Sequence, residues 1–281
     1  MKAFLTLLQK ELWEYRIVVK LPLFLALFAV LNFAFVMMSD NATISIQSTG
    51  NGVIDWGLRS DGFTGLIGKL NELIAGMLYL ILFMIYVPKT LRKEKEEGTL
   101  MFWRSMPVSD YLTIAAKLAF ILVLVPVIAS ALLAFSDFIV WLMASMWLPA
   151  DMMQSWQISL PNILVHWGQF IGTLAMMSLA LFPLACGLLV VSQLTRYPLL
   201  SVMFAIILIK IALFQITGNG ELGSQFSAFY GLPVDVLMSE SALNTYLDFG
   251  WFANGGMLLG GVGLFWVSCW LRGRDDATKA V

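Results

Sequence analysis

Residues 112–144 read LTIAAKLAFILVLVPVIASALLAFSDFIVWLMA, a nearly continuous apolar run. An α-helix rises about 1.5 Å per residue, so about 20 apolar residues are enough to cross the hydrocarbon core of a bilayer. Five other blocks meet this requirement, near residues 18–38, 66–87, 163–192, 197–217 and 251–271. The sequence therefore predicts an all-α polytopic membrane protein, with six transmembrane helices in a single domain over residues 1–281.

Proline and glycine positions predict how these helices bend and pack. The blocks at 112–144 and 163–192 are longer than a bilayer needs, so they must tilt, bend or project into water. Proline removes one helical hydrogen bond, which makes Pro126 and Pro183 the expected bend points. In the last block a small-residue surface is formed by Gly255, Gly256, Gly260, Gly261 and Gly263, and Gly256 and Gly260 have the GxxxG spacing that permits close helix approach. We expect this surface to pack within the chain first, and to form a subunit interface second.

The composition agrees with a bilayer environment and excludes several classes of function. The chain is 59% hydrophobic and 12% charged, whereas soluble domains carry about 25% charged residues. A net charge of −1 gives no electrostatic reason to bind nucleic acid. The single histidine, His166, excludes a HExxH zinc site, and Cys186 and Cys269 lack metal-ligand spacing. No GxxxxGK[ST] phosphate loop occurs, so we expect a non-catalytic chain that holds no cofactor or metal of its own.

The distribution of lysine and arginine predicts the orientation, because these residues accumulate on the cytoplasmic side of membrane proteins. Connections 39–62, 145–162 and 218–250 contain only one such residue, Arg59. The largest basic groups flank the first two spans and are Lys2, Lys10, Arg16, Lys20, Lys89, Arg92, Lys93, Lys95 and Arg104. The alternation predicts that both termini face the cytoplasm of a bacterial inner membrane, with residues 218–250 as an outer segment.

Residues 1–17 are expected to form an amphipathic helix in the membrane interface rather than a signal peptide, with a plain cytoplasmic lead-in helix as the alternative. At helical spacing, one face carries Phe4, Leu5, Leu8, Leu12 and Tyr15. The opposite face carries Lys2, Thr6, Gln9 and Lys10, which we expect to meet water and lipid headgroups. The helix would lie on the membrane lipid and lead into the first span.

The connection at 88–111 is the most informative part of the sequence, since residues 89–117 read KTLRKEKEEGTLMFWRSMPVSDYLTIAAK. Opposite charges at i, i+4, as in Arg92 with Glu96, predict that the second span continues as a charged helix. Gly98 is able to end that helix in the left-handed conformation. Ser109 or Asp110 is placed to cap the next helix.

Between these two boundaries lies a short amphipathic stretch, residues 99–106, with large apolar side chains. Leu100, Met101, Phe102 and Trp103 supply those side chains, and Pro107 ends the stretch. An exposed apolar surface of this kind requires a partner, and a groove on a second protein would provide one. The alternative is a tight loop on the membrane surface.

The sequence Glu97-Gly98-Thr99-Leu100, followed by Ser105-x-Pro107-Val108-Ser109 and Lys117, resembles the "EEGTLE…LLSLPVSR…K" segment of type-2 ABC transporter permeases. The local motif covers about 25 residues, and the layout of six spans with an amphipathic N-terminal helix is similar over the whole chain. Two departures are Met101, where the family has an acidic residue, and Trp103-Arg104, where it has a more aliphatic pair.

The resemblance implies a permease subunit that moves a substrate when a separate ABC ATPase subunit hydrolyses ATP with Mg²⁺. In that family the segment forms a cytoplasmic coupling helix that docks on the ATPase, and the permease works with a second copy or a related permease. Carried onto this sequence, the coupling residues are Glu97, Gly98, Thr99, Leu100, Phe102, Trp103, Arg104, Met106 and Pro107. A membrane subunit that drives an envelope assembly machine without transport shares these features and remains an alternative, whereas no catalytic cluster supports a membrane enzyme.

Ionisable residues inside membrane spans are costly and are usually paired or functional. Four candidates, all near the outer ends of their spans, are Lys69, Glu72, Asp137 and Lys210. Lys69 and Glu72 are expected to pair along one helix, and Asp137 and Lys210 between helices. The set predicts either ion pairs near the outer interface or a polar vestibule for a departing substrate.

Overall fold

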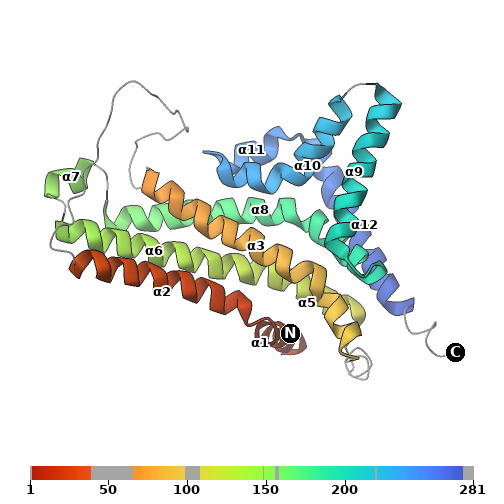
Figure 1. The fold of residues 1–281 in the computed structure, drawn as a ribbon, viewed down its shortest axis with the longest axis horizontal. Helices are drawn as coiled ribbons and strands as arrows, with labels where there is room; N and C mark the ends of the chain where they lie inside the picture. Colours follow the sequence, from red (N-terminus) through yellow and green to blue (C-terminus); the bar gives the residue numbers. More distant parts are fainter. Residues whose placement is uncertain are drawn as a thin grey trace. The chain divides into compact units, whose positions relative to one another are not determined.

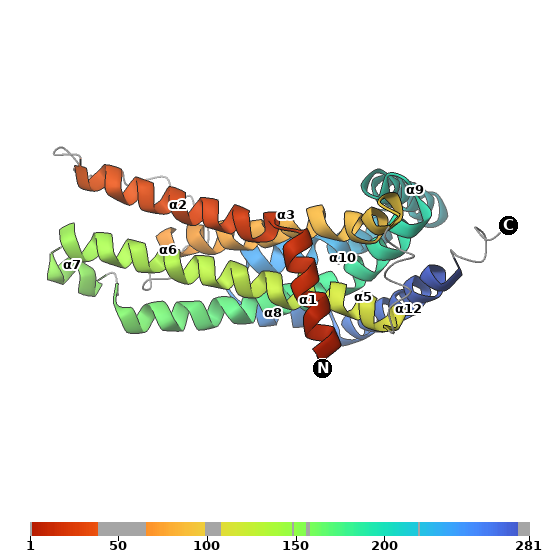
Figure 2. The same cartoon turned by 90° about the horizontal axis from the view of Figure 1, so that it is seen from below.

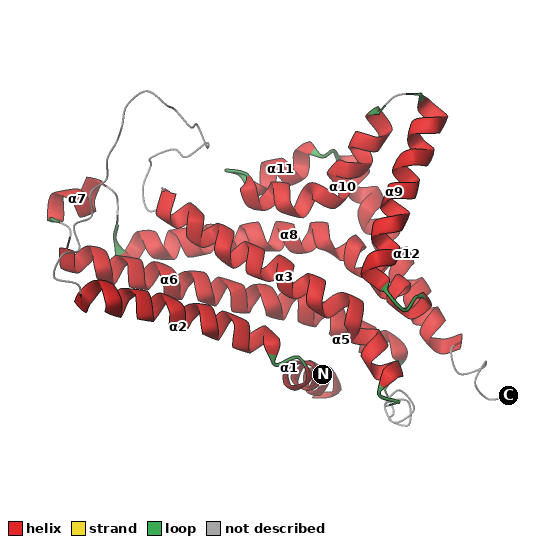
Figure 3. Ribbon diagram, in the orientation of Figure 1, coloured by secondary structure: helices red, strands yellow, loops and turns green. Residues whose placement is uncertain are grey.

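The computed structural model describes residues 2–38, 66–98, 108–147, 149–155, 158–218 and 220–274. Within these ranges the chain forms helices and short connections without any strand (Figures 1 and 3). The helices are α1 (Lys2–Glu14), α2 (Ile17–Met38), α3 (Leu66–Glu96), α5 (Asp110–Ala119), α6 (Val125–Trp147), α7 (Ala150–Ser155), α8 (Leu160–Leu194), α9 (Pro198–Thr217), α10 (Glu221–Met238), α11 (Ala242–Asp248) and α12 (Trp251–Arg274).

Six helical segments of the described residues are long and apolar enough to cross a membrane. They are Ile17–Phe35, Gly68–Glu94, Asp110–Met146, Leu160–Leu194, Pro198–Ile216 and Trp251–Arg274. Each coincides with one block of the sequence, and the prediction of an all-α polytopic membrane protein is confirmed. The two longest segments, of 37 and 35 residues, are the two that exceeded the length of a simple span.

The helices group into two compact units. One unit comprises Met1–Arg16, Tyr79–Pro126 and Gly172–Val281, and the other comprises Ile17–Leu78 and Val127–Ile171. In the first unit α1 packs against α5, α12 packs against α5, and α10 packs against α9 and α11 (Figure 2). In the second unit a small apolar cluster of Ala144, Ile158 and Ile163 holds the ends of α6 and α8 beside α7.

The long third span contains a π-helical turn, Phe120–Leu124, between α5 and α6. In this turn the N–H of Val125 donates to the carbonyl of Phe120, one residue farther back than in an α-helix. Pro126 follows directly, and a proline ring crowds the carbonyl four residues before it. The wider turn therefore lies at the predicted bend point, because it relieves the crowding that Pro126 would cause in a regular α-helix.

The predicted small-residue surface of α12 packs within the chain at Gly261, whereas the GxxxG pair itself makes no such close approach. A Cβ at Gly256 or Gly260 would meet no atom of the neighbouring described residues within 4 Å. A Cβ at Gly261 would lie 2.7 Å from Cε1 of Phe182 and 3.1 Å from Cα of Pro183. The close intrachain approach of α12 to α8 therefore occurs at Gly261, one residue beyond the predicted pair.

Replacing Gly261 with alanine is expected to destabilise the protein by about 1–3 kcal/mol, because the added methyl group overlaps the Phe182 ring and the α8 backbone. Gly260→Ala is the matched control, with open space at the Cβ. It should be neutral or gain up to about 1 kcal/mol from helix propensity. Chemical unfolding of both purified variants in one detergent measures the difference, and equal stabilities would contradict the packing described.

Candidate functional site

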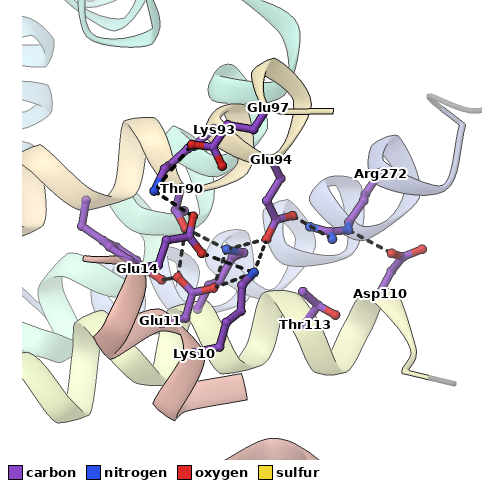
Figure 4. A network of polar contacts seen from close by, with 12 residues as sticks. Lys10, Glu11, Glu14, Thr90, Lys93, Glu94, Glu97, Asp110, Thr113 and Arg272 are labelled. Carbon is purple, nitrogen blue, oxygen red and sulfur yellow. Dashed lines mark hydrogen bonds and ion pairs between the residues drawn. The ribbon is translucent and has the colours of Figure 1, made fainter. Parts of the chain in front are cut away.

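A network of buried ion pairs joins helices α1, α3, α5 and α12 at the end of α3 and the start of α5 (Figure 4). Its central members are four acids and four bases, and Glu97 joins them at the edge through Lys93. The acids are Glu11 and Glu14 of α1, Glu94 of α3 and Asp110 of α5, and the bases are Lys10, Lys93, Lys117 and Arg272. All belong to the same compact unit.

Lys117 of α5 lies at the centre of the network and is 1% exposed. Its Nζ lies 2.7 Å from Oε1 of Glu11 and 3.0 Å from Oε1 of Glu94. It also donates to Oγ1 of Thr90 at 2.9 Å, while the hydroxyl of Tyr86 donates to Oε2 of Glu11 at 2.8 Å. The ammonium group is thus surrounded by acceptors, which is the condition under which a lysine is stable away from water.

Glu94 of α3 connects three other helices through its carboxylate. Oε1 of Glu94 lies 3.0 Å from Nζ of Lys10 on α1 and 3.0 Å from Nζ of Lys117 on α5. Oε2 lies 3.0 Å from Nη2 of Arg272 on α12, and Nε of Arg272 donates to Oδ1 of Asp110 at 2.9 Å. One carboxylate therefore fixes the end of α3 to α1, α5 and α12 together.

Two residues of α1 depart from the predicted amphipathic arrangement, Lys10 and Leu5, whereas Tyr15 of the predicted apolar face is buried as expected. Lys10 contacts Glu94, and Glu11 is 2% exposed, whereas Leu5 is 61% exposed. Thr6 and Gln9 lie on the exposed face, as predicted. Burial, with the carboxylates of Glu11, Glu14 and Glu94 adding to it, raises the pKa of Tyr15. The reason for the difference is that carboxylate and ammonium partners on α3 and α5 outweigh solvation of the same groups in water.

The network lies immediately beside the segment that the sequence identified as the coupling segment. Gly98 ends α3 with a φ of +67°, and Ser109 caps α5 by accepting from the N–H of Leu112 at 3.3 Å, so both predicted boundaries are confirmed. Glu97 is exposed and pairs with Lys93 at 3.8 Å. The remaining predicted coupling residues lie outside the described residues, namely Thr99, Leu100, Phe102, Trp103, Arg104, Met106 and Pro107.

Arg92 extends the connections of α3 to the link between α8 and α9. Its Nη1 donates to the carbonyl oxygens of Thr195 and Arg196, which follow the last turn of α8. Carbonyl groups at a helix end have no partner within the helix, so a guanidinium group satisfies them well. Together with Glu94, this contact ties the end of α3 to α1, α5, α12 and the link between α8 and α9.

Each of the four ionisable residues predicted near the outer ends of the spans has a partner in the structure. Lys69 and Glu72 pair along α3 at 2.8 Å, as predicted. Oδ1 of Asp137 accepts from Asn71 at 2.9 Å and Oδ2 lies 2.6 Å from Nδ1 of His166. Lys210 lies over the ring of Tyr230, 5.7 Å from its centroid. The predicted pair between Asp137 and Lys210 would join the two compact units and stays a prediction.

A cavity of about 230 Å³ lies beside this cluster, between α2, α3 and α6. Apolar side chains form most of its wall, and Asn32, Asn71 and Ser136 supply its polar groups. None of the four charged residues predicted to form a vestibule lines it. In the described ranges, no group of three or more His, Cys, Asp or Glu side chains is placed to hold a metal ion.

Sequence reasoning missed Glu11, Glu94, Lys117, His166 and Arg272 as members of buried polar clusters. A signal existed for two of them, since Lys117 and His166 lie inside predicted apolar spans, where an ionisable residue is usually paired. Glu94 stood in a run of charges that predicted a solvated helix surface. Comparisons with protein-family models, with curated proteins and with solved structures found no match for this chain.

Proposed function

We propose that this chain is the membrane-spanning permease subunit of an ATP-driven exporter of the type-2 ABC kind. ATP, with Mg²⁺, would be bound and hydrolysed by a separate ABC ATPase subunit. The permease itself would be non-catalytic, would work with a second copy or a related permease, and would move its substrate across or out of a bacterial inner membrane. Both termini and segment 99–107 would face the cytoplasm, as the distribution of lysine and arginine predicts.

The observation that carries the proposal is the buried network on both sides of segment 99–107. The preceding helix α3 is fixed through Glu94, and the following helix α5 is fixed through Asp110 and Lys117. A force applied to the segment would enter these two helices directly, and would reach α1 and α12 through Glu11 and Arg272. This is the arrangement that a coupling segment between two spans requires.

The cost of separating buried charges supports movement of these helices as one body. Glu11, Glu94, Lys117 and Arg272 are each at most 4% exposed. Removing the partner of a buried charge costs about 3–5 kcal/mol. A rotation that keeps the pairs intact has no such cost. Closure of an ATPase dimer would therefore rock α1, α3, α5 and α12 together rather than slide them past one another.

The direct test is whether an ATP-binding subunit co-purifies with the full-length chain from its native membranes. We expect a photoreactive ATP analogue to label a co-purifying polypeptide, and we expect the double variant Phe102→Asp/Trp103→Asp to lose it, because charge at these positions removes the apolar docking surface. Gln9→Ala, at an exposed position of α1 outside the predicted coupling residues, is the control and should retain the subunit. An ATP-binding polypeptide retained equally by the double variant, or no such polypeptide, would contradict the proposal.

A further inference from the structure

A chain of polar contacts crosses three helices in the unit formed by Ile17–Leu78 and Val127–Ile171. Asp137 of α6 lies 2.6 Å from Nδ1 of His166 on α8, and Nε2 of His166 lies 3.4 Å from Oε1 of Glu72 on α3. The other oxygen of Glu72 lies 2.8 Å from Nζ of Lys69. Side-chain exposure rises along this chain, from 0% at Asp137 and 1% at His166 to 12% at Glu72 and 20% at Lys69.

The imidazole of His166 lies between two carboxylates, one at each ring nitrogen. A neutral imidazole carries only one N–H and would direct a lone pair at one of these carboxylate oxygens. The doubly protonated ring has an N–H for each side. Oδ1 of Asp137 accepts from the amide of Asn71, so Oδ2 is the oxygen that faces Nδ1, and a proton between these two atoms is bound by the Asp137–His166 pair.

The charge balance favours the same state. With His166 doubly protonated, its charge and that of Lys69 offset the charges of Asp137 and Glu72. With the ring neutral, the cluster would hold an uncompensated negative charge inside membrane-spanning segments, where such a charge is costly. Other ionisable side chains in the described part of this unit are the exposed Lys20 on α2 and Asp151 on α7, so no further cation from these elements replaces the proton.

We infer that His166, with Asp137 and Glu72, is a proton-binding site that holds α3, α6 and α8 together. The bound proton gives the ring its second N–H, so that each ring nitrogen presents an N–H toward one carboxylate. Any rearrangement that moves α8 away from α3 or α6 releases that proton toward the Glu72 and Lys69 side, which is the more exposed. By linkage, a rise in pH on that side favours the rearranged form. This inference does not depend on the identity of a partner subunit.

His166 is the single histidine of the chain, which makes a direct spectroscopic test available. Full-length protein, labelled with ¹⁵N-histidine and purified with a tag free of histidine, gives one pair of ring-nitrogen signals. At pH 7.5 a free imidazole, with a pKa of about 6.5, is about nine-tenths neutral. We expect both nitrogens of His166 to show the protonated shifts at this pH. A neutral, single-tautomer pattern in the wild-type chain would overturn the inference.

The connection to helix packing is tested by the pH dependence of thermal unfolding. His166→Gln keeps a side chain that hydrogen bonds but removes the bound proton. The doubly protonated ring makes both contacts, so its contribution is present at low pH and is lost as the pH rises. We expect the wild-type unfolding temperature to fall more than that of His166→Gln between pH 6 and pH 9. If the unfolding temperatures of the two proteins change in parallel with pH, His166 does not hold the helices together as inferred. The ¹⁵N spectrum of the wild-type chain remains a test even if His166→Gln does not fold.

Discussion

Replacing Lys117 with methionine is expected to destabilise the protein by about 3–5 kcal/mol. Methionine fills a similar volume, so the loss is mainly electrostatic. Glu11 keeps its hydrogen bond from Tyr86, and Glu94 keeps Lys10 and Arg272, but both carboxylates lose their shared cation while almost completely buried. Chemical unfolding of the purified full-length variant in detergent measures the change in free energy.

The control for Lys117→Met is Glu97→Gln, which breaks a pair whose side chains are 34% and 51% exposed. Exposed ion pairs contribute at most about 1 kcal/mol. The double variant Lys117→Met/Glu11→Gln should recover part of the loss, because it removes the buried carboxylate of Glu11, whose remaining cation is Lys10 at 3.7 Å. If Lys117→Met unfolds as the control does, or if the second substitution only adds to the loss, the network does not stabilise this unit as described.

The second large effect is expected in the reaction of single introduced cysteines with a membrane-impermeant maleimide. The difference in labelling between the two sides of the membrane should be close to all-or-none. The native cysteines, Cys186 and Cys269, are buried. Both are replaced by alanine, so that the background contains no native thiol. A thiol at position 103, from Trp103→Cys, should react with a membrane-impermeant maleimide in inside-out vesicles and not in intact cells. A thiol at position 244, from Asn244→Cys in the exposed part of α11, should react in intact cells.

Labelling of both positions from the same side would contradict the predicted topology. Labelling with the two sides exchanged would place segment 99–107 outside the cell, where no ATPase subunit is available to bind it. The unmodified background without the native cysteines controls for labelling of other groups. The mass of each labelled chain, read after purification, gives the extent of reaction.

The local features of the fold were predictable because they depend on neighbours in sequence. Apolar runs of about 20 residues gave the six spans. Gly98 and Ser109 gave the two boundaries beside segment 99–107, since a left-handed residue and an N-cap are properties of one turn of chain. Pro126 marked the place where the third span departs from α-helical geometry.

The buried clusters were not predictable to the same degree, because their members come from distant parts of the sequence. Lys117 contacts Glu11 across 106 positions, and Arg272 contacts Asp110 across 162 positions. A sequence shows that Lys117 needs a counter-charge, but it does not show which of several acids supplies it. The same limitation left Asn71 and His166 unrecognised as partners of Asp137.

Helix α1 shows a further limitation of pattern-based reasoning. Its apolar positions predicted which face would avoid water, on the assumption that charged side chains are solvated. In the structure Lys10 and Glu11 find partners on α3 and α5, and Leu5 and Trp13 are exposed at 61% and 69%. The orientation of α1 therefore depends on its tertiary partners as well as on its apolar pattern.

The central claim is that segment 99–107 transmits the action of an ATPase into the membrane helices, and ATP hydrolysis by the reconstituted complex tests it most directly. The complex of the full-length chain and its co-purified ATPase is assembled in nanodiscs, and its hydrolysis rate is compared with that of the ATPase alone. The account predicts that the wild-type chain changes the rate and that Trp103→Asp abolishes this change, while Gln9→Ala, at an exposed position of α1, preserves it. A rate that is the same with the wild-type chain, with Trp103→Asp and without any permease would contradict it.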